Sequence, residues 1–333
     1  MNETDNPRLV LVAQLERDGR LREALAIMQE EARAGDAHAY FMLGVRSMGA
    51  RAAQRARAAE LLAAASRRGH AEAQRLLSVL EASAAETADD WRRALDALTQ
   101  AAAMGSDHAK REIALLGAAA DFDATASLES PAPRVVSDAP RVSVIEGFLA
   151  MEVCDWIVGF ARSKPQQRVE VVDPMTGVGR VDHGRTNTGT YFGLSGLDVM
   201  TCLVKARIGA ALGMAVRNQE DTNVLHYDPG QAFHQHCDFL DPEQSGHAQE
   251  IAAIGQRVAT FLIYLNDDYE GGETDFPMLS WRYRGRKGDA LVFWNVSPQG
   301  RVERKLLHAG LPPTSGEKWL LSQWVRDRPV QLI

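Results

Sequence analysis

Cysteine is scarce in this chain of 333 residues, which contains only Cys154, Cys202 and Cys237. Three cysteines this far apart do not form a disulfide framework, and they suit a reducing compartment. No apolar stretch is long enough to span a membrane, and residues 1–7 contain no basic, apolar leader. We therefore expect a cytoplasmic protein that does not interact with a membrane.

An excess of positive charge is also missing. The chain carries 44 acidic and 37 basic residues, which gives a formal net charge of −7. This balance provides no general attraction to nucleic acid, so no nucleic-acid partner is expected. The length is compatible with two domains, each large enough to bury a core.

Proline is absent from residue 8 to residue 130, where alanine, leucine, arginine and glutamate are frequent. Apolar residues in this region follow helical spacing. Leu21, Ala24, Leu25 and Met28 lie at positions i, i+3, i+4 and i+7. This stripe predicts one side of a helix that faces the core.

An internal repeat runs through the same region, in which a glycine is followed four positions later by an alanine. The repeat glycines, Gly35, Gly69 and Gly105, are 34 and 36 residues apart. A period of this length predicts stacked helix pairs, and the pattern resembles Sel1-like repeats, relatives of the tetratricopeptide class. Residues 1–118 are therefore expected to form an α-helical repeat domain. Each repeat also carries a histidine that we interpret as a surface or packing residue and not as a metal ligand: His38, His70 and His108.

Proline returns between residues 119 and 140, together with alanine and serine. This composition predicts a semi-extended linker. Residues 141–333 are then predicted to form a second domain that is rich in strands. Helices are expected at about 150–163 and 197–212, and short apolar runs predict buried strands at 257–266, 290–294 and 319–324.

The second domain is organised around His236-Cys237-Asp238. Side chains two residues apart on an extended strand point to the same face, so His236 and Asp238 would present an imidazole and a carboxylate together. A distant histidine would complete a facial triad that binds iron. His-x-Asp alone is a weak signal, and a polar strand end is the alternative. His234 lies two residues before His236 and is interpreted as a neighbouring or solvent-facing residue.

Motifs on both sides of this tripeptide make the signal specific. They follow in a fixed order: Tyr227-x-x-Gly230-Gln231, Leu265-Asn266, Gly271-Gly-Glu-Thr274, Lys287-Gly-Asp289, His308-Ala-Gly310 and Gly316-Glu-Lys318-Trp319. The set resembles the prolyl 4-hydroxylase branch of the Fe(II)/2-oxoglutarate dioxygenases over residues 141–327. The resemblance implies a double-stranded β-helix, a jelly roll of the cupin kind with flanking helices. The expected fold class is thus multidomain α + β.

The resemblance also implies the cofactors and their ligands. Fe(II), 2-oxoglutarate and O2 would be required, with ascorbate as an optional reductant. His236, Asp238 and His308 would hold the iron, and Lys318 would bind the far carboxylate of 2-oxoglutarate. The further candidate cofactor contacts, each of which has an ordinary packing residue as its alternative, are Tyr227, Tyr264 and Trp324.

Three other positions of the second domain concern the substrate. Phe233 stands where many relatives carry a tyrosine, which removes a hydroxyl from the site. Residues 177–189, which include Arg185, are expected to be a mobile strand and loop near the substrate entrance, or else a plain surface loop. Residues 241–254 directly follow the ligand pair and are interpreted as a candidate lid.

The resemblance favours a peptidyl hydroxylase, with proline as the residue modified, similar to procollagen-proline 4-dioxygenase. The repeats would then help to recruit a protein or peptide substrate, because repeat solenoids offer extended binding surfaces. A hydroxylase of a free amino acid or another small metabolite is the alternative, since a family resemblance does not fix a substrate. A third hypothesis is that the protein is a non-catalytic repeat scaffold. The complete set of His236, Asp238, His308 and Lys318 argues against it.

Overall fold

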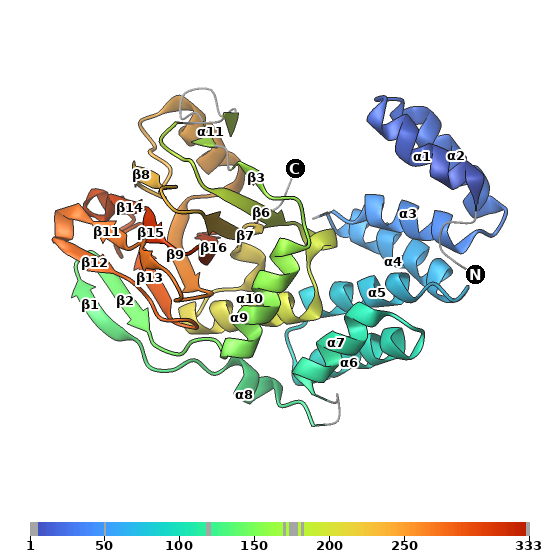
Figure 1. Cartoon of the computed structure of the whole chain (residues 1–333), viewed down its shortest axis with the longest axis horizontal. Coiled ribbons are helices and arrows are strands. Elements are labelled where there is room, and N and C mark those ends of the chain that lie inside the picture. Colours follow the sequence, from blue (N-terminus) through green and yellow to red (C-terminus); the bar gives the residue numbers. More distant parts are fainter. Residues whose placement is uncertain are drawn as a thin grey trace. The chain divides into compact units, whose positions relative to one another are not determined.

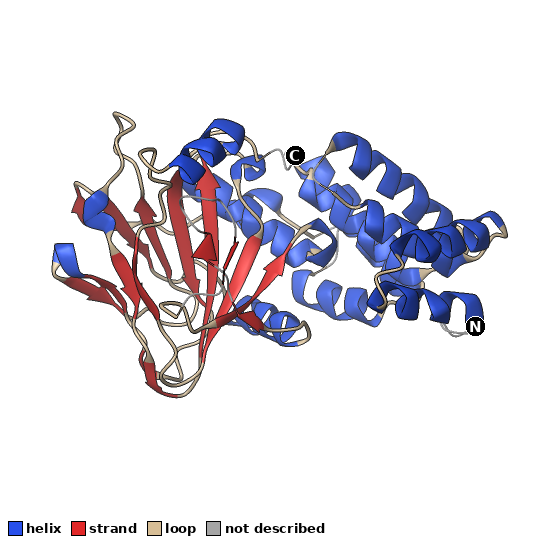
Figure 2. Cartoon of the chain, turned by 90° about the horizontal axis from the view of Figure 1, so that it is seen from above, coloured by secondary structure: helices blue, strands red, loops and turns tan. Residues whose placement is uncertain are grey.

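The computed structural model describes residues 6–49, 51–117, 121–168, 171–172, 179–180 and 183–330. The chain divides into two compact units (Figures 1 and 2). A helical unit comprises Met1–Ser127 and Leu194–Val204, and a β-sheet unit comprises Leu128–Gly193 and Lys205–Gln331. Among the described residues, no helix combines the length and the apolar character needed to cross a membrane.

The helical unit is a succession of antiparallel helices in which each helix packs on the next (Figure 1). The helices are α1 (Pro7–Arg17), α2 (Leu21–Arg33), α3 (Ala37–Ser47), α4 (Ala52–Ser66), α5 (Ala71–Ser83), α6 (Ala88–Ala103) and α7 (Asp107–Leu116). The repeat glycines Gly35, Gly69 and Gly105 follow α2, α4 and α6 and have φ angles of 95°, 89° and 108°. This left-handed region favours glycine, which explains why the repeat keeps it.

The residue after each repeat glycine begins the next helix. The side chains of Asp36, His70 and Ser106 accept hydrogen bonds from the backbone N–H three residues later, at Ala39, Ala73 and Ala109. Such N-caps satisfy an otherwise unpaired helix donor. The repeat pattern therefore marks the turns between helix pairs.

The expected apolar stripe on α2 is only partly correct. Ala24 and Met28 are fully buried, but Leu21 and Leu25 are 59% and 41% exposed. The buried line of α2 runs through Ala24, Met28 and Ala32. The stripe was too wide, because the neighbouring helices α1 and α3 cover a narrower face than the i, i+3, i+4, i+7 pattern describes.

The β-sheet unit contains a large antiparallel sheet in the order β1-β2-β13-β9-β16-β7-β6-β3. Its strands are β1 (Arg134–Asp138), β2 (Arg141–Ile145), β3 (Gln167–Arg168), β6 (Thr188–Phe192), β7 (Thr222–Tyr227), β9 (Arg257–Tyr264), β13 (Ala290–Trp294) and β16 (Lys318–Arg326). The smaller sheet has the order β12-β11-β14-β8. Its strands are β8 (Phe233–His236), β11 (Thr274–Phe276), β12 (Trp281–Tyr283) and β14 (His308–Gly310).

Two short ribbons complete the strands, β4 (Val171–Val172) with β5 (Gly179–Arg180) and β10 (Glu270–Gly271) with β15 (Pro313–Ser315). One apolar core draws side chains from both larger sheets, including Phe276 from β11 and Leu262, Phe293 and Leu320 from the large sheet. The unit is therefore an antiparallel β-sheet domain with the packing of a jelly roll. The apolar runs at 257–266, 290–294 and 319–324 are confirmed as strands β9, β13 and β16.

The helices expected at 150–163 and 197–212 are present as α9 (Met151–Arg162) and α10 (Val199–Leu212). The stretch 119–140, expected to be a linker, contains regular structure: a short helix α8 (Ala124–Leu128) and the edge strand β1. The strand lies between Pro133 and Pro140, and Arg134, Val135, Ser137 and Asp138 pair with β2. Proline content alone did not reveal this short strand.

Candidate active site

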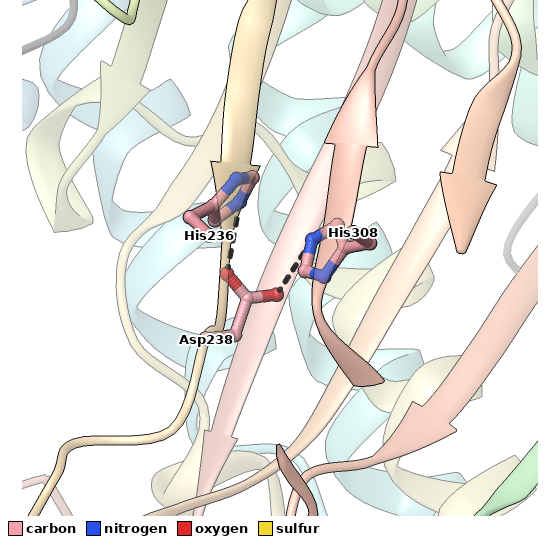
Figure 3. Close-up of side chains that lie close together, drawn as sticks. All are labelled: His236, Asp238 and His308. Carbon is pink, nitrogen blue, oxygen red and sulfur yellow. Dashed lines mark ion pairs between the residues drawn. The ribbon is translucent and has the colours of Figure 1, made fainter. Parts of the chain in front are cut away.

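A histidine, an aspartate and a second histidine meet at the smaller sheet (Figure 3). β8 and β14 are antiparallel neighbours, and His236 is the cross-strand partner of His308. Asp238 lies two residues beyond the end of β8. Its Oδ1 lies 3.5 Å from His236 Nε2, and its Oδ2 lies 3.7 Å from His308 Nε2. The three residues that the sequence named as iron ligands are thus brought together.

A β-bulge determines which side chains of β8 face this group. His308 pairs with His236 and Gly310 pairs with Phe233, so β8 has one more residue than β14 between these pairs. The extra residue shifts the alternation of side chains. Phe233 therefore lies against His236, with ring centroids 3.5 Å apart, and His234 is exposed. The simple two-residue alternation, which would have placed His234 beside His236, fails for this reason.

Backbone carbonyl groups fix the tautomers of both histidines. His236 Nδ1 lies 2.8 Å from the carbonyl oxygen of His234, and His308 Nδ1 lies 2.9 Å from that of Leu306. A carbonyl oxygen only accepts, so each Nδ1 donates and each Nε2 presents a lone pair to the centre. Burial, together with the nearby His236, lowers the pKa of His308 to about 4, which keeps this imidazole neutral and able to bind a metal.

Two residues that the sequence did not single out hold Asp238. The Thr260 hydroxyl donates to Asp238 Oδ2 at 2.7 Å, and Asn295 Nδ2 donates to the Thr260 hydroxyl at 3.0 Å. Burial acts to raise the pKa of the Asp238 carboxyl, but His308, His236 and Thr260 outweigh it and keep this pKa below its usual range. In the sequence, the only indication of this support is that Thr260 is a polar residue within the largely apolar strand β9.

Lys318 begins β16 and is 1% exposed. Its Nζ donates to the carbonyl oxygen of Gly272 at 2.8 Å. Among the described residues no carboxylate forms an ion pair with it, and burial lowers its pKa to about 7. A buried ammonium with one carbonyl acceptor matches a site for the carboxylate of a bound molecule, because buried charges are normally paired.

Two tyrosines line the environment of Lys318. Tyr227 is its cross-strand partner on β7, and the Lys318 Nζ is 5.2 Å from the Tyr227 ring centroid and 5.5 Å from that of Tyr264. The Tyr264 hydroxyl lies 2.8 Å from the Thr274 hydroxyl. Both tyrosines lie close to Lys318, and their contact with a cosubstrate stays a prediction.

Trp324 lies on the same face of β16 as Lys318, six residues along the strand. Its ring is covered by Arg257, whose guanidinium carbon is 3.7 Å from the ring centroid, and its cross-strand partner on β9 is Thr260. Trp324 therefore lies beside Thr260, which hydrogen-bonds to Asp238, and farther along the strand from Lys318. A role for Trp324 in cofactor binding stays a prediction.

Arg185 does not fit the alternative of a plain surface loop for residues 177–189. Arg185 is buried, its guanidinium carbon lies 4.2 Å from the centroid of the Phe233 ring, and its Nε donates to Asn187 Oδ1 at 3.3 Å. An isolated bridge between Arg185 and Phe233 brings the backbone there. Of the predicted mobile segment, residues 177–178 and 181–182 lie outside the described residues. The pairing with β8 is non-local, so composition could not reveal it.

The candidate lid, residues 241–254, contains the helix α11 (Ser245–Ile254). Gln256 closes its base: its Oε1 accepts from the backbone N–H of Leu240 at 2.8 Å, and its Nε2 donates to the Leu240 carbonyl at 2.7 Å. The buried Arg326 forms an ion pair with Glu250 on α11. Residues 241–254 therefore form a helix that is bound to the rest of the β-sheet unit. Their movement as a lid over the site stays a prediction.

The donor set agrees with a mononuclear iron site. Two neutral imidazoles and one carboxylate form the facial arrangement typical of Fe(II) oxygenases, which leaves coordination positions open for substrates. Lys318 is a buried ammonium, the kind of group that would pair with the second carboxylate of 2-oxoglutarate. The residues present thus fit both iron and 2-oxoglutarate.

Comparisons with known proteins agree with this geometry. Residues 222–326 match the 2OG-Fe(II) oxygenase superfamily. The chain is 34% identical over 212 residues to prolyl 4-hydroxylase 1 of Arabidopsis thaliana, which covers 59% of this chain and 72% of that protein. The chain belongs to the prolyl 4-hydroxylase family. It is accordingly a dioxygenase that depends on Fe(II), 2-oxoglutarate and O2.

Further members of the family are similar over the same extent. Prolyl 4-hydroxylase 5 of Arabidopsis thaliana is 34% identical over 211 residues, with 57% of this chain and 69% of that protein covered. Among solved structures, the viral collagen prolyl hydroxylase of Paramecium bursaria Chlorella virus-1, in complex with 2-oxoglutarate, is 30% identical. That match has a TM-score of 0.44 and covers 57% of this chain and 98% of the viral chain.

Proposed function

We propose that this prolyl 4-hydroxylase family member hydroxylates proline in a peptide or protein. The proposal rests on one observation: His236, Asp238 and His308 lie together in the same β-sheet unit as the buried Lys318. Relatives at 34% identity bear the name prolyl 4-hydroxylase, which supports a peptidyl substrate. Iron and 2-oxoglutarate, when bound, would supply the oxidation of a substrate C–H bond, with succinate and CO2 as co-products.

The protein's own residues would orient these groups. His236 and His308 offer Nε2, and their Nδ1–H groups are held by carbonyls, so the rings cannot turn without losing a hydrogen bond. Asp238 offers the oxygen that Thr260 leaves free. The outer hydrogen bonds therefore define the direction of all three ligands before the metal binds.

Lys318 would bind the far carboxylate of 2-oxoglutarate. A charge-assisted hydrogen bond of this kind contributes roughly 1.5–3 kcal/mol. The carboxylate would also restore the full charge of an ammonium whose pKa burial has lowered. Tyr227, beside Lys318 on β7, would exclude water from this end of the cosubstrate.

Arg185 would position the substrate. Its guanidinium lies over Phe233, which in turn stacks on His236, so it is connected to the iron ligands through one aromatic ring. The Nε donor is used by Asn187, and we assign the terminal N–H groups to a carbonyl oxygen of the substrate backbone. A guanidinium can donate to a peptide carbonyl or to the carboxylate of a free amino acid, so this contact would serve either class of substrate.

The helical unit would recruit the protein that carries the proline. Its spaced glycines, N-caps and paired helices support the assignment of Sel1-like repeats. Stacked helix pairs offer an extended surface for a polypeptide. We further propose a cytoplasmic location, with ascorbate as the reductant that restores Fe(II) after uncoupled turnover.

The test uses the full chain with Fe(II) and 2-oxoglutarate. Proline-containing peptides and free L-proline are incubated separately, and mass spectrometry records the gain of one oxygen atom per molecule. We expect hydroxylated peptide, formed in step with succinate, and unchanged free proline. Hydroxylation of free proline with unchanged peptides would assign the enzyme to small metabolites instead.

A further inference from the structure

A second group of side chains of the types that can bind a metal lies in the helical unit, away from the motifs of the dioxygenase. His108 and Glu112 are one turn apart on α7, and Asp198 directly precedes α10. The His108 Nε2 lies 3.7 Å from Glu112 Oε2 and 3.5 Å from Asp198 Oδ2. Both carboxylate side chains are 0% exposed. All three residues belong to the same compact unit.

Each carboxylate uses one oxygen to bind the start of α10. Glu112 Oε1 accepts from the backbone N–H of Met200 at 2.7 Å. Asp198 Oδ1 accepts from the backbone N–H and the hydroxyl of Thr201, at 2.7 and 2.5 Å. The second oxygen of each carboxylate is turned towards His108. Both carboxylates are therefore held in place by the protein independently of the atoms that face His108.

The oxygen of Glu112 that faces His108 is buried and accepts no hydrogen bond from any described residue. Leaving a charged oxygen buried without a donor costs several kcal/mol in general, so such atoms are normally satisfied by a partner. Burial, followed by the charge of Asp198, raises the pKa of Glu112 well above its ordinary value. A cation between the two carboxylates would remove both of these penalties.

Among the described residues, the two earlier repeats lack a pair of carboxylates next to the residue that corresponds to His108. The residue three positions after the repeat glycine contacts the residue that caps the next helix. His38 Nδ1 lies 3.1 Å from His70 Nε2, and Glu72 hydrogen-bonds to the Ser106 hydroxyl. These two junctions are closed by direct hydrogen bonds between neighbouring repeats.

The third junction is built differently. His108 occupies the same repeat position, and Asp198 caps α10 as the counterpart of the earlier cap residues. Here the distance between the two side chains is 3.5 Å, longer than an ordinary N–H···O hydrogen bond, and a second carboxylate, Glu112, has joined them. The junction is therefore wider and more negatively charged than the other two.

The distances match those of the candidate iron site. There, the imidazole-to-carboxylate separations are 3.5 and 3.7 Å, as they are in the second group. Metal–ligand bonds of about 2.0–2.2 Å place the donors of one tetrahedral ion roughly 3.3–3.6 Å apart. Side chains at this separation fit around one ion better than they fit a direct hydrogen bond.

We propose that His108, Glu112 and Asp198 bind a divalent first-row transition-metal ion that is distinct from the active-site iron. One imidazole and two carboxylates suit Zn(II), Fe(II) or Mn(II), and no thiolate takes part. The charge of Arg75 on α5 also acts on Glu112, and Arg75 Nε forms an ion pair with Glu72. The ion would fix the start of α10 to α7. His108 is then a ligand, contrary to the expectation from its repeat position.

The experiment counts bound metal in the full-length protein. Zn(II) is titrated in competition with a chromophoric chelator, and metal content after dialysis is measured by mass spectrometry. Wild type should bind two equivalents, one at each group, and His308→Ala and His108→Ala should each bind one. His38→Ala is the matched control, because it removes the histidine at the same position of the first repeat and should still bind two.

Two conservative variants separate binding from folding. Glu112→Gln keeps an acceptor for the Met200 N–H, and Asp198→Asn keeps the cap of α10. We expect both to retain the helix content of wild type while weakening Zn(II) binding at this group by about 100-fold. Co(II) should give a d–d absorption band that His308→Ala retains and that is lost in the His108→Ala/His308→Ala double variant.

Two results would contradict the proposal that His108, Glu112 and Asp198 bind a metal ion. One is a wild-type stoichiometry of a single equivalent that His108→Ala leaves unchanged. The other is a folded Glu112→Gln protein that binds Zn(II) as wild type does and melts at a higher temperature, which would show that Glu112 and Asp198 share a proton instead of an ion. Turnover of 2-oxoglutarate by the iron-loaded His108→Ala protein serves as a separate readout and should equal that of wild type.

Discussion

His236 on β8 and His308 on β14 are direct cross-strand partners, although 72 positions separate them in the sequence. The pairing places both Nε2 atoms beside Asp238. β8 is the edge strand of the smaller sheet, and its backbone is bound both by β14 and by the bridge between Arg185 and Phe233. The positions of the metal ligands consequently depend on the pairing of β8 with β14 and on its bulge.

The first prediction concerns the metal ligands. His308→Ala should abolish the conversion of 2-oxoglutarate to succinate, because two of three ligands do not define an iron site. Succinate formation with Fe(II) and no added substrate is the measurement. His234→Ala is the control: that side chain is exposed, and its backbone carbonyl still accepts from His236. Normal succinate formation by His308→Ala would remove this residue from the ligand set.

The second prediction concerns Lys318. Lys318→Ala should raise the 2-oxoglutarate concentration needed for half-maximal turnover by roughly thirtyfold, which corresponds to a loss of about 2 kcal/mol. Iron affinity should stay nearly the same, because the lysine contacts no iron ligand. Lys318→Arg should restore only part of the affinity, since a planar guanidinium does not replace a compact ammonium. Lys305→Ala, at an exposed lysine of the same unit, should behave as wild type.

The third prediction is a pH dependence with a defined sign. The cosubstrate binds the charged form of Lys318, whose pKa burial has lowered to about 7. Below pH 7 the ammonium is present, and above pH 7 each bound 2-oxoglutarate must be accompanied by proton uptake. The apparent affinity for 2-oxoglutarate should therefore fall as pH rises from 7 to 9, by up to about tenfold per unit. Lys318→Arg should show no such fall, because arginine stays charged.

The lowered pKa of Lys318 also affects the free energy of unfolding in the absence of cosubstrate. The pKa of Lys318 is lower in the folded protein than in the unfolded chain, where lysine titrates near its ordinary value. Between these two values the unfolded chain binds more protons, so this group makes the free energy of unfolding increase with pH above 7. Saturating 2-oxoglutarate should reduce that slope. An identical slope in Lys318→Met would assign it to other groups.

The fourth prediction concerns the support of Asp238. Thr260→Val keeps the shape of the side chain and removes the hydroxyl that donates to Asp238 Oδ2. We expect iron affinity to fall by roughly 10-fold or more, as for other outer hydrogen bonds of metal sites. Turnover should recover at high Fe(II) concentration. Thr314→Val, at an exposed threonine on β15, is the control, and an unchanged iron requirement in Thr260→Val would count against this role.

The fifth prediction concerns removal of the helices. Residues 194–204 group with the helical unit, and Leu197, Val199 and Met200 are buried there. A chain that starts at Leu128 would expose these apolar side chains. We expect it to be less soluble and to unfold at a lower temperature than the full chain. A truncated protein of undiminished melting temperature would show that the burial of these residues contributes little.

Short-range patterns predicted much of this architecture. The strands at 257–266 and 290–294 and the helix at 150–163 follow from local composition and are present as β9, β13 and α9. His308 and Lys318 were recognised because a motif order, and not a local pattern, pointed to them. Each such prediction depended on residues close together in the chain or on an ordered set of motifs.

Features that arise from long-range pairing were not predicted. The bulge in β8 is defined only when β14 lies beside it, so alternation could not decide between the neighbouring and the solvent-facing position of His234. The burial of Arg185 requires the backbone of residue 233, 48 positions away. The neighbours of His108 are unusual because Asp198 comes from outside the repeat region. In each case the decisive partner is far away in the sequence.

The start of α10 also has a consequence for the order of synthesis. Glu112 and Asp198 are 86 positions apart, yet the oxygens of Glu112 are needed by the backbone of residue 200. At elongation rates of about 5–20 residues per second, α7 leaves the ribosome roughly 4–17 s before its partner is made. During this interval a nascent chain exposes the buried face of α7. The last helical repeat is therefore completed only after residues 128–193, the first segment of the β-sheet unit, have been translated.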